Sequence, residues 1–202
     1  MIADTERSPP PSNLVLASTS TYRRMLVERL GVPFRCRTPN CDESILKGEE
    51  SNPRHLAERL AYHKASSLVR AEPDAAIIGC DQLVSFQGQI FGKPATFARA
   101  VDQLEKMAGE THELITALVV ISGERTYRHT DVTKLQMRPL SRASIERYVA
   151  ADQPLDCAGS YKLESRGIVL FDKIETDDHT TITGVPLIAL TTILRDLGFE
   201  IP

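Results

Sequence analysis

Hydrophobic and polar residues follow one another along the chain in patterns that predict strands and helices in turn. Short apolar runs between turn residues predict buried strands, and apolar residues spaced three and four apart predict helices. Strands are predicted at residues 13–17, 33–37, 75–79, 83–86, 89–91, 112–122, 125–136 and 167–174. Helices are predicted at residues 22–30, 53–69, 96 to about 107, 141 to about 151, and after Gly184, Val185 and Pro186. This order, with two hairpins, indicates an α/β fold with a mixed sheet.

Two stretches interrupt this pattern. Residues 1–12 are polar and rich in proline, without the apolar centre of a secretory signal, so we expect a disordered lead-in there. Residues 153–166 form a long polar loop, and long ordered loops are often functional. No apolar run approaches the ~20 residues that a membrane-spanning helix needs.

Composition and charge narrow the class of protein. Of 202 residues, 42% are hydrophobic and 25% are charged, which is typical of a soluble globular protein, and we expect residues 13–202 to form a single domain. The chain has 24 Lys and Arg against 27 Asp and Glu, giving a net charge of -3. Because generic nucleic-acid binders are basic, any phosphate site here must be local.

The cysteines and histidines show no spacing that is typical of a metal site. The four cysteines form no CxxC pair, and the five histidines form no HxH or HExxH motif. We therefore expect reduced thiols in a cytoplasmic protein, and no zinc site.

A loop of small hydroxyl residues joins the first predicted strand to the first predicted helix. Ser18, Thr19 and Ser20 are good N-cap residues, and the N–H groups at a helix start attract anions. Arg23 and Arg24 add positive charge where a phosphate would lie. The loop is therefore a candidate phosphate site, and an ordinary helix cap beside two solvated arginines is the alternative.

Asp81 follows the apolar strand predicted at residues 75–79, with Cys80 before it and Gln82 after it. An acid just past the carboxyl end of such a strand lies where open α/β sheets bind ligands. It can hold a metal ion or act as a base toward water. The alternative is an aspartate that only serves a turn.

Two lysines are candidates for phosphate binding. Lys64 interrupts the apolar stripe of the helix predicted at residues 53–69, so its ammonium either reaches water along the helix or points into a cleft. Lys93 lies in the segment 88–94, whose glycines are four apart and whose Pro94 stands where a P-loop has Ser or Thr. This mismatch excludes a Walker-type NTPase and leaves Lys93 as a phosphate-binding lysine on a rigid turn.

Loop carboxylates complete the set of candidates. Glu43 and Glu164 lie in predicted loops, where a single acid is more often solvated than functional. Together with Asp81 and the cations, they fit a metal-assisted attack of water on a polyphosphate. The chain has no GxSxG motif of a serine hydrolase. Nothing in the sequence around Cys80 favours the thiolate that cysteine catalysis needs.

With these motifs collected, the sequence resembles the Maf family of nucleoside triphosphate pyrophosphatases over residues 13–197. The match is closest to the branch that cleaves 7-methylguanosine triphosphate. The matching segments, in chain order, are LASTSTYRR, CDES, LAYHKA, IIGCDQLV, GKP, THELIT, YVAADQPLDCAGSYKLE and TGVPLIAL. The resemblance implies an elongated fold, a mixed twisted sheet flanked by helices with a central cleft between two lobes, similar to inosine triphosphate pyrophosphatases.

The resemblance also implies cleavage between the α and β phosphates, which releases a nucleoside monophosphate and pyrophosphate and needs a divalent cation, Mg²⁺ or Mn²⁺. Asp81 matches the family's proton acceptor and, with Glu43, would hold the cation. Arg23 matches the arginine beside the triphosphate. Lys64 and Lys93 match the family's cleft lysines.

Three further positions match those that the family links to the choice of base, namely Tyr22, Gln82 and Glu164. The amides of Ser18–Ser20 would help to neutralise the triphosphate. The chain departs from the family pattern at Thr21, where proline is usual, and at Tyr22, where this branch often has tryptophan. A Tyr22 that only packs in the apolar stripe of its helix is the alternative to base binding.

We therefore expect a pyrophosphatase that hydrolyses 7-methylguanosine triphosphate and removes modified nucleotides. Its partner would be a small nucleotide, not nucleic acid or a membrane, and a homodimer stays open. One alternative is a pyrophosphatase for pyrimidine or other non-canonical triphosphates. Another is a non-catalytic, nucleotide-binding regulator of cell division, which pyrophosphate release with Mg²⁺ or Mn²⁺ would distinguish from an enzyme.

Overall fold

The computed structural model describes residues 11–201, and within that range seven strands form one mixed sheet. The strand order is β2-β1-β3-β5-β6-β7, with β4 paired to the carboxyl-terminal end of β3. Strand β1 is parallel to β2 and β3, and the other pairs are antiparallel. The strands are β1 (Asn13–Ala17), β2 (Arg35–Arg37), β3 (Ala75–Phe86), β4 (Gln89–Phe91), β5 (Thr111–Ser122), β6 (Arg125–Met137) and β7 (Phe171–Glu175). The expected α/β fold with a mixed sheet is confirmed.

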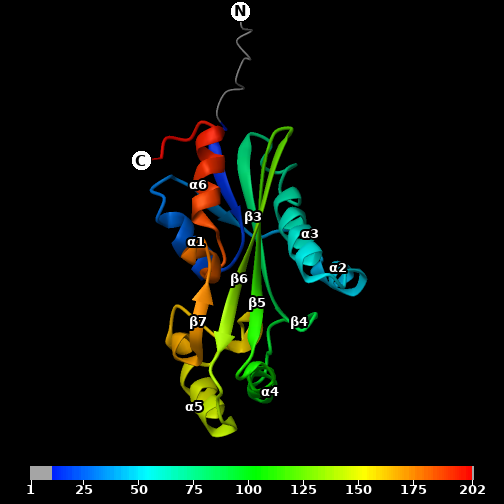
Figure 1. The fold of residues 1–202 in the computed structure, drawn as a ribbon. Helices are drawn as coiled ribbons and strands as arrows, with labels where there is room; N and C mark the ends of the chain where they lie inside the picture. Colours follow the sequence, from blue (N-terminus) through cyan, green and yellow to red (C-terminus); the bar gives the residue numbers. More distant parts are fainter. Residues whose placement is uncertain (1–10, 202) are drawn as a thin grey trace, which may run out of the picture.

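Helices cover both faces of the sheet and its lower end (Figure 1). They are α1 (Thr21–Glu28), α2 (Glu43–Glu49), α3 (Pro53–Ser66), α4 (Phe97–Met107), α5 (Arg142–Asp152) and α6 (Leu187–Asp196), with 3₁₀ turns η1 (Ala158–Ser160), η2 (Arg166–Leu170) and η3 (His179–Thr183). Ser20, Thr96 and Ser141 cap α1, α4 and α5 through their side chains, as expected from the sequence. In residues 11–201, no helix is both long and apolar enough to cross a bilayer.

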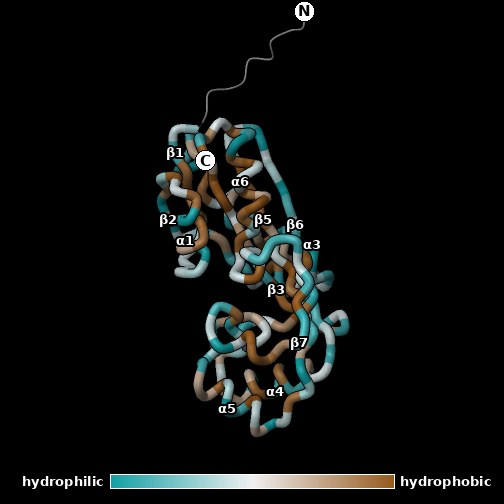
Figure 2. Tube along the Cα trace, turned by 60° about the vertical axis from the view of Figure 1, so that its left-hand side comes forward, coloured by the Kyte–Doolittle hydropathy of each residue, from teal (hydrophilic) through white to brown (hydrophobic). Residues whose placement is uncertain are grey.

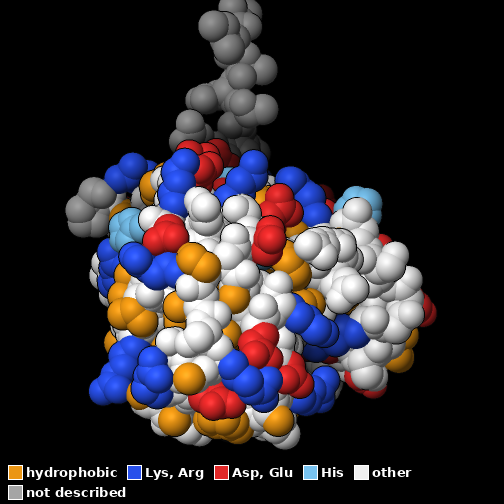
Figure 3. Space-filling view, turned by 60° about the horizontal axis from the view of Figure 1, so that its bottom comes forward, with side chains coloured by type: hydrophobic (Ala, Val, Ile, Leu, Met, Phe, Trp, Pro, Cys, Tyr) orange, Lys and Arg blue, Asp and Glu red, His pale blue; other side chains and the backbone are white. Residues whose placement is uncertain are grey.

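The long strands β3, β5 and β6 run through the whole molecule (Figure 1). In the upper part, α1 and α6 cover one face of the sheet and α3 covers the other, while α4 and α5 close the lower end (Figures 1 and 2). On the face drawn in Figure 3, basic and acidic side chains are interspersed, with hydrophobic atoms scattered between them. The long strands and the helices packed at their two ends give the molecule an elongated shape (Figures 1 and 2).

Three hydrophobic clusters hold these layers together. One packs α3 against the sheet through residues such as Leu60 and Ile77, and a second packs α1 and α6 against the opposite face through residues such as Ile78 and Leu190. The third fills the lower part between α4, α5 and the ends of the long strands, around Leu104. In each cluster the strands contribute every second residue, and the helices contribute residues three or four positions apart.

The structure corrects several element predictions. Strand β3 does not end at residue 79 but continues without a break to Phe86, so the predicted strand at residues 83–86 is its second half. Glu43 lies not in a loop but at the start of α2, whose N-cap is Asp42. The strand predicted at residues 167–174 is wrong in its first half, where η2 precedes β7.

The smaller differences lie at element ends. Helix α1 ends at Glu28 and α3 at Ser66, short of the predicted residues 30 and 69, and β2 begins at Arg35. Pro186 is the N-cap of α6, so its ring immediately precedes the helix. The lead-in predicted for residues 1–12 lies outside the described residues, apart from Pro11 and Ser12.

The register of β3 leaves part of its edge open. Its first residues pair with β1 up to Ile78, and pairing with β4 begins only at Val84. On its other side, β5 pairs with β3 throughout this stretch, from Ile77 to Ser85. Among the described residues, no strand therefore pairs with β3 between Ile78 and Val84 on the edge that β1 and β4 share. The carboxyl end of β1 and the hairpin of β4 border this gap from above and below.

Candidate active site

A cleft of about 440 Å³ opens at this uncovered edge of β3. That volume is within the range of small-molecule sites. Its walls come from the loop between β1 and α1, from α2, α3 and the β4 hairpin, and from the long loop after α5. All but one of the site residues predicted from the sequence line it, namely Ser18, Tyr22, Arg23, Glu43, Lys64, Gln82, Lys93 and Glu164. The exception, Asp81, lies directly behind Lys64.

Lys64 joins two carboxylates that come from separate elements. Its ammonium lies 2.5 Å from Asp81 Oδ1 and 3.0 Å from Glu43 Oε1. Lys64 is only 8% exposed and Asp81 only 6% exposed. The lysine that interrupts the apolar stripe of α3 therefore points into the cleft wall, not into solvent.

The backbone brings these three residues together for a simple steric reason. Side chains alternate along a strand, so Asp81 lies on the same face of β3 as Gly79, the face that α3 covers. A Cβ atom at Gly79 would lie 2.8 Å from Ala65 N and still closer to Ala61 O. Only glycine lets α3 approach this closely, and the approach places Lys64 against Asp81.

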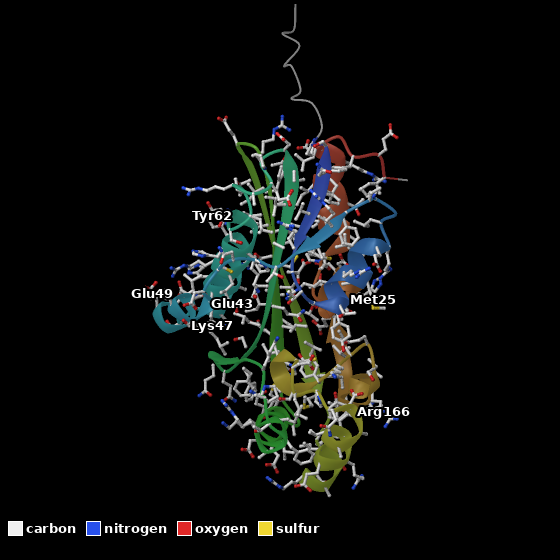
Figure 4. All side chains as sticks on the ribbon, turned by 180° about the vertical axis from the view of Figure 1, so that it is seen from behind. Met25, Glu43, Lys47, Glu49, Tyr62 and Arg166 are labelled. Atoms are coloured by element: carbon white, nitrogen blue, oxygen red, sulfur yellow. The ribbon has the colours of Figure 1, made fainter. Side chains whose placement is uncertain are left out.

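The charges of this group stabilise one another. Burial disfavours the ammonium, but the charges of Asp81 and Glu43 outweigh that effect and raise the pKa of Lys64 above its usual value. Burial also disfavours ionised Glu43, but a hydrogen bond from Lys47 and the charge of Lys64 lower the pKa of Glu43 to about 2. Figure 4 shows Glu43 at the end of α2 nearest the sheet, with Lys47 beside it. Lys64 is therefore a cation, and Glu43 an anion, near neutral pH.

The loop between β1 and α1 folds as the sequence predicts. Ser18 Oγ accepts a hydrogen bond from Ser20 N, and Ser20 Oγ caps α1 by accepting from Arg23 N. The Arg23 side chain turns toward the cleft and donates from Nε to Gly184 O, 3.2 Å away. Gly184 has φ of 112°, and a side chain there would press on the guanidinium. The cleft wall thus combines a helix N-terminus with a held arginine, a combination suited to a phosphate group.

Gln82 lies on the opposite face of β3 from Asp81. Its Nε2 donates to Thr116 Oγ1 at 2.9 Å, to Thr181 O at 2.9 Å and to Ile182 O at 3.1 Å. These three acceptors fix the orientation of the amide. Its Oε1 is then the atom with capacity to accept a hydrogen bond from a ligand in the cleft.

Tyr22 and Glu164 both line the cleft, Tyr22 from α1 and Glu164 from the long loop after α5. Burial raises the pKa of Tyr22, so its phenol stays neutral near pH 7. Burial also raises the pKa of Glu164, with the charge of Lys162 acting in the opposite direction. A second hollow, lined by Met25 of α1 among others, continues past this pair.

The cleft also contains residues that the sequence did not single out. Asp156, Cys157 and Tyr161 line it, and all three belong to the long polar loop at residues 153–166. The length and polarity of that loop were the available signal, but they did not indicate which side chains face the cleft. Burial raises the pKa of Cys157 to about 12, so its thiol is not a nucleophile.

The cleft wall offers two carboxylates, those of Asp81 and Glu43, to a metal ion. Among residues 11–201, no group of three or more His, Cys, Asp or Glu side chains is placed to hold one. The carboxylates of Asp81 and Glu43 nevertheless fit Mg²⁺ or Mn²⁺, because such hard cations often bind one or two carboxylates and take their remaining ligands from water and substrate phosphates.

Comparisons with known proteins give the relatives of this chain and agree with its fold. A 7-methyl-GTP pyrophosphatase of Bdellovibrio bacteriovorus is 50% identical over 187 residues, covering 93% of this chain and 98% of that protein. A 7-methyl-GTP pyrophosphatase of Xanthomonas axonopodis pv. citri is 46% identical over 189 residues, covering 94% and 98%. The solved structure of a HAM1 protein from Coxiella burnetii shares the fold, with a TM-score of 0.51 and 14% identity over 91% of this chain and 98% of that one. A family model described as Maf-like protein matches residues 13–197, and the chain belongs to the Maf family.

Proposed function

We propose that this protein hydrolyses the bond between the α and β phosphates of 7-methylguanosine triphosphate, releasing the monophosphate and pyrophosphate. The observation that carries the proposal is the group of Lys64, Asp81 and Glu43 at the wall of a cleft that Arg23 also lines. The names of relatives that are 46–50% identical over nearly the whole chain support the choice of substrate. In this proposal residues 13–202 form one catalytic domain, with two lobes around the cleft.

In the proposed reaction, water attacks the α phosphorus and the bond to the bridging oxygen breaks, so that pyrophosphate leaves. Asp81 accepts the proton of the water at Oδ2, because its Oδ1 is paired with Lys64. Lys64 holds this carboxylate in place through the contact with Oδ1. Asp81 and Glu43 are also the residues that would hold Mg²⁺ or Mn²⁺, which when bound neutralises charge on the phosphate oxygens.

The triphosphate would lie between the two ends of the cleft. Arg23 and the amides that follow Ser18 approach it from the upper part, and Lys93 approaches it from the β4 hairpin below. Phosphoryl transfer asks little covalent chemistry of the protein, so the contribution of these groups is positioning and charge neutralisation.

The base would lie against Tyr22 and Glu164. Methylation at N7 gives guanine a positive charge, which favours an aromatic face and a nearby carboxylate. Guanine also presents N1–H and its exocyclic amine as neighbouring donors, which the Glu164 carboxylate can accept. Because Gln82 Nε2 is used within the protein, Oε1 is its contact with the base.

Pyrophosphate release tests this proposal directly. The wild-type protein, with Mg²⁺ or Mn²⁺, is offered 7-methylguanosine triphosphate, GTP, UTP, TTP and inosine triphosphate. The highest kcat/KM is expected for the methylated nucleotide. A preference for a pyrimidine would move the assignment to another substrate of the same class. If no nucleotide released pyrophosphate with either metal, the protein would be a nucleotide-binding protein without this activity.

Removing the Lys64 ammonium is expected to lower kcat/KM for the methylated nucleotide by at least about tenfold, the size of a lost charge-assisted contact. Lys64→Met keeps the unbranched stem and removes the charge. Arg59→Met serves as the matched control, because Arg59 lies on the same helix and pairs with Glu49 at the surface. If folded Lys64→Met protein retained wild-type kinetics and only its Tm fell, Lys64 would be a structural residue.

Glu164→Gln is expected to lower kcat/KM for 7-methylguanosine triphosphate by at least about tenfold, because one charge-assisted hydrogen bond to the base is lost. Activity on UTP should fall much less, since uracil lacks both the donor pair and the positive charge. Glu110→Gln, an exposed carboxylate outside the cleft lining, is the control. Equal losses on both nucleotides would assign Glu164 to the metal or to the fold.

A further inference from the structure

Two loops of the lower part carry residues of the cleft. The first follows β4 and contains Lys93, and the second follows α5 and contains Glu164. The loops touch through their backbones, where Ala95 N donates to Leu155 O at 3.0 Å. Both the lysine and the glutamate therefore depend on how these two loops are held against each other.

Gln103 of α4 bonds to both loops with the two ends of one amide. Its Nε2 donates to Gly92 O at 3.2 Å, next to Lys93. Its Oε1 accepts from Ser160 Oγ at 2.5 Å, in the loop of Glu164. A flipped amide would place its oxygen against the carbonyl of Gly92, so only this orientation satisfies both partners.

The Ser160 end of this link is held under strain. Ser160 is fully buried, and its φ of 66° is a left-handed conformation that residues other than glycine seldom adopt. Gly159 before it is packed so closely that a Cβ atom would lie 2.7 Å from Val84 Cγ2 and 2.9 Å from Tyr161 Cε1. A strained, buried segment persists only where its surroundings hold it, and the bond to Gln103 is part of that support.

We propose that Gln103 is a positioning residue that sets the distance between Lys93 and Glu164. It thereby matches the cleft to a substrate with a particular distance between its base and its phosphates. Gln103 is not among the residues that line the cleft, and it acts through the two loops. The inference rests on the proposed function for its kinetic consequence, but not for its structural one.

Three variants test the proposal. Gln103→Met keeps the size of the side chain and removes both hydrogen bonds, whereas Ser160→Ala removes only the bond to the loop of Glu164. Gln136→Met makes the same chemical change as Gln103→Met at an exposed position of β6, and it is the control.

Amide hydrogen exchange of the free proteins is measured first, because it needs no activity. Gln103→Met is expected to raise exchange at residues 92–95 and at residues 158–164 together, by at least about fivefold, the effect of one lost hydrogen bond on an opening equilibrium. Ser160→Ala should raise it only at residues 158–164, and Gln136→Met at neither segment.

Kinetic measurements then distinguish the effect of the Glu164 loop from that of the Lys93 loop. Ser160→Ala is expected to lower kcat/KM for 7-methylguanosine triphosphate about fivefold and to leave UTP nearly unchanged, because only the base side is loosened. Gln103→Met should lower both, by about tenfold for the methylated nucleotide. Adding Ser160→Ala to Gln103→Met should change little further, because the bond between the two residues is already gone.

The outcomes distinguish this inference from the proposed function. If the wild type releases no pyrophosphate, the proposed function fails while hydrogen exchange still tests the link. Unchanged exchange in either loop of Gln103→Met would overturn the link itself. Changed exchange with kinetics equal to those of Gln136→Met would overturn the role of Gln103 in substrate selection.

Discussion

Replacing Asp81 with asparagine is expected to reduce kcat by ~10²–10⁴-fold, the usual contribution of a general base. The amide keeps the shape of the side chain and can still accept a hydrogen bond from Lys64, which also retains its 3.0 Å contact with Glu43. What the variant loses is a basic oxygen and a negative charge at the cleft wall. The loss should therefore fall on turnover for every nucleotide, without preference for a base.

The measurement is kcat with saturating metal, together with the Tm and circular dichroism of the variant. Asp74→Asn is the control, because Asp74 is an exposed residue just before β3. Folded Asp81→Asn protein with kcat near that of the wild type would remove Asp81 from the reaction. Another group of the cleft would then have to take the proton.

Strands β5 and β6 and the hairpin between them are predictable, because apolar residues run through β5 and Gly123 marks the turn. The predicted break in β3 is wrong: Asp81 and Gln82 are polar, and polar residues after an apolar run usually mark a strand end. In the structure β5 pairs with β3 throughout this stretch, so the strand continues. Gln82 then lines the cleft beside the open edge, and Asp81 lies behind Lys64. The end of β1, not that of β3, opens the site.

Two other elements were beyond pattern reasoning for physical reasons. Helix α2 contains Ile45 and Leu46 but also Gly48, and too few apolar residues to form a helical stripe, so the pattern predicts a loop at Glu43. The apolar run after Gly167 resembles a strand, but a Cβ at Gly167 would lie 2.5 Å from Lys162 O. That tight backbone contact lies at the start of the 3₁₀ turn η2, and contacts of this kind leave no periodicity in the sequence.

In the site, too, some features are predictable from the sequence and others are not. Individual candidates such as Lys64 stand out because a charge interrupts an apolar stripe. The ion pairs among Lys64, Asp81 and Glu43 could not be predicted, because they depend on how closely α3 approaches β3. That distance is set by a single glycine, which the sequence alone presents only as one small residue in a strand.

Gly79→Ala is therefore expected to disturb both stability and activity, although Gly79 touches no ligand. The added Cβ would meet Ala61 O and Ala65 N, which are backbone atoms of α3 and cannot rotate away. The helix has to shift outward, and overpacking of this kind costs roughly 1–3 kcal/mol. For a chain of this length, each lost kcal/mol lowers Tm by about 2–4 °C.

The shift also moves Lys64 away from Asp81, so kcat/KM should fall together with Tm, by about tenfold or more, the size of a weakened charge-assisted contact. Gly48→Ala is the matched control, because a Cβ there meets nothing within 4 Å and alanine favours the helix of α2. That variant should keep wild-type kinetics and an equal or higher Tm. If Gly79→Ala behaved like Gly48→Ala in both measurements, the close approach of α3 to β3 would not be what places Lys64 against Asp81.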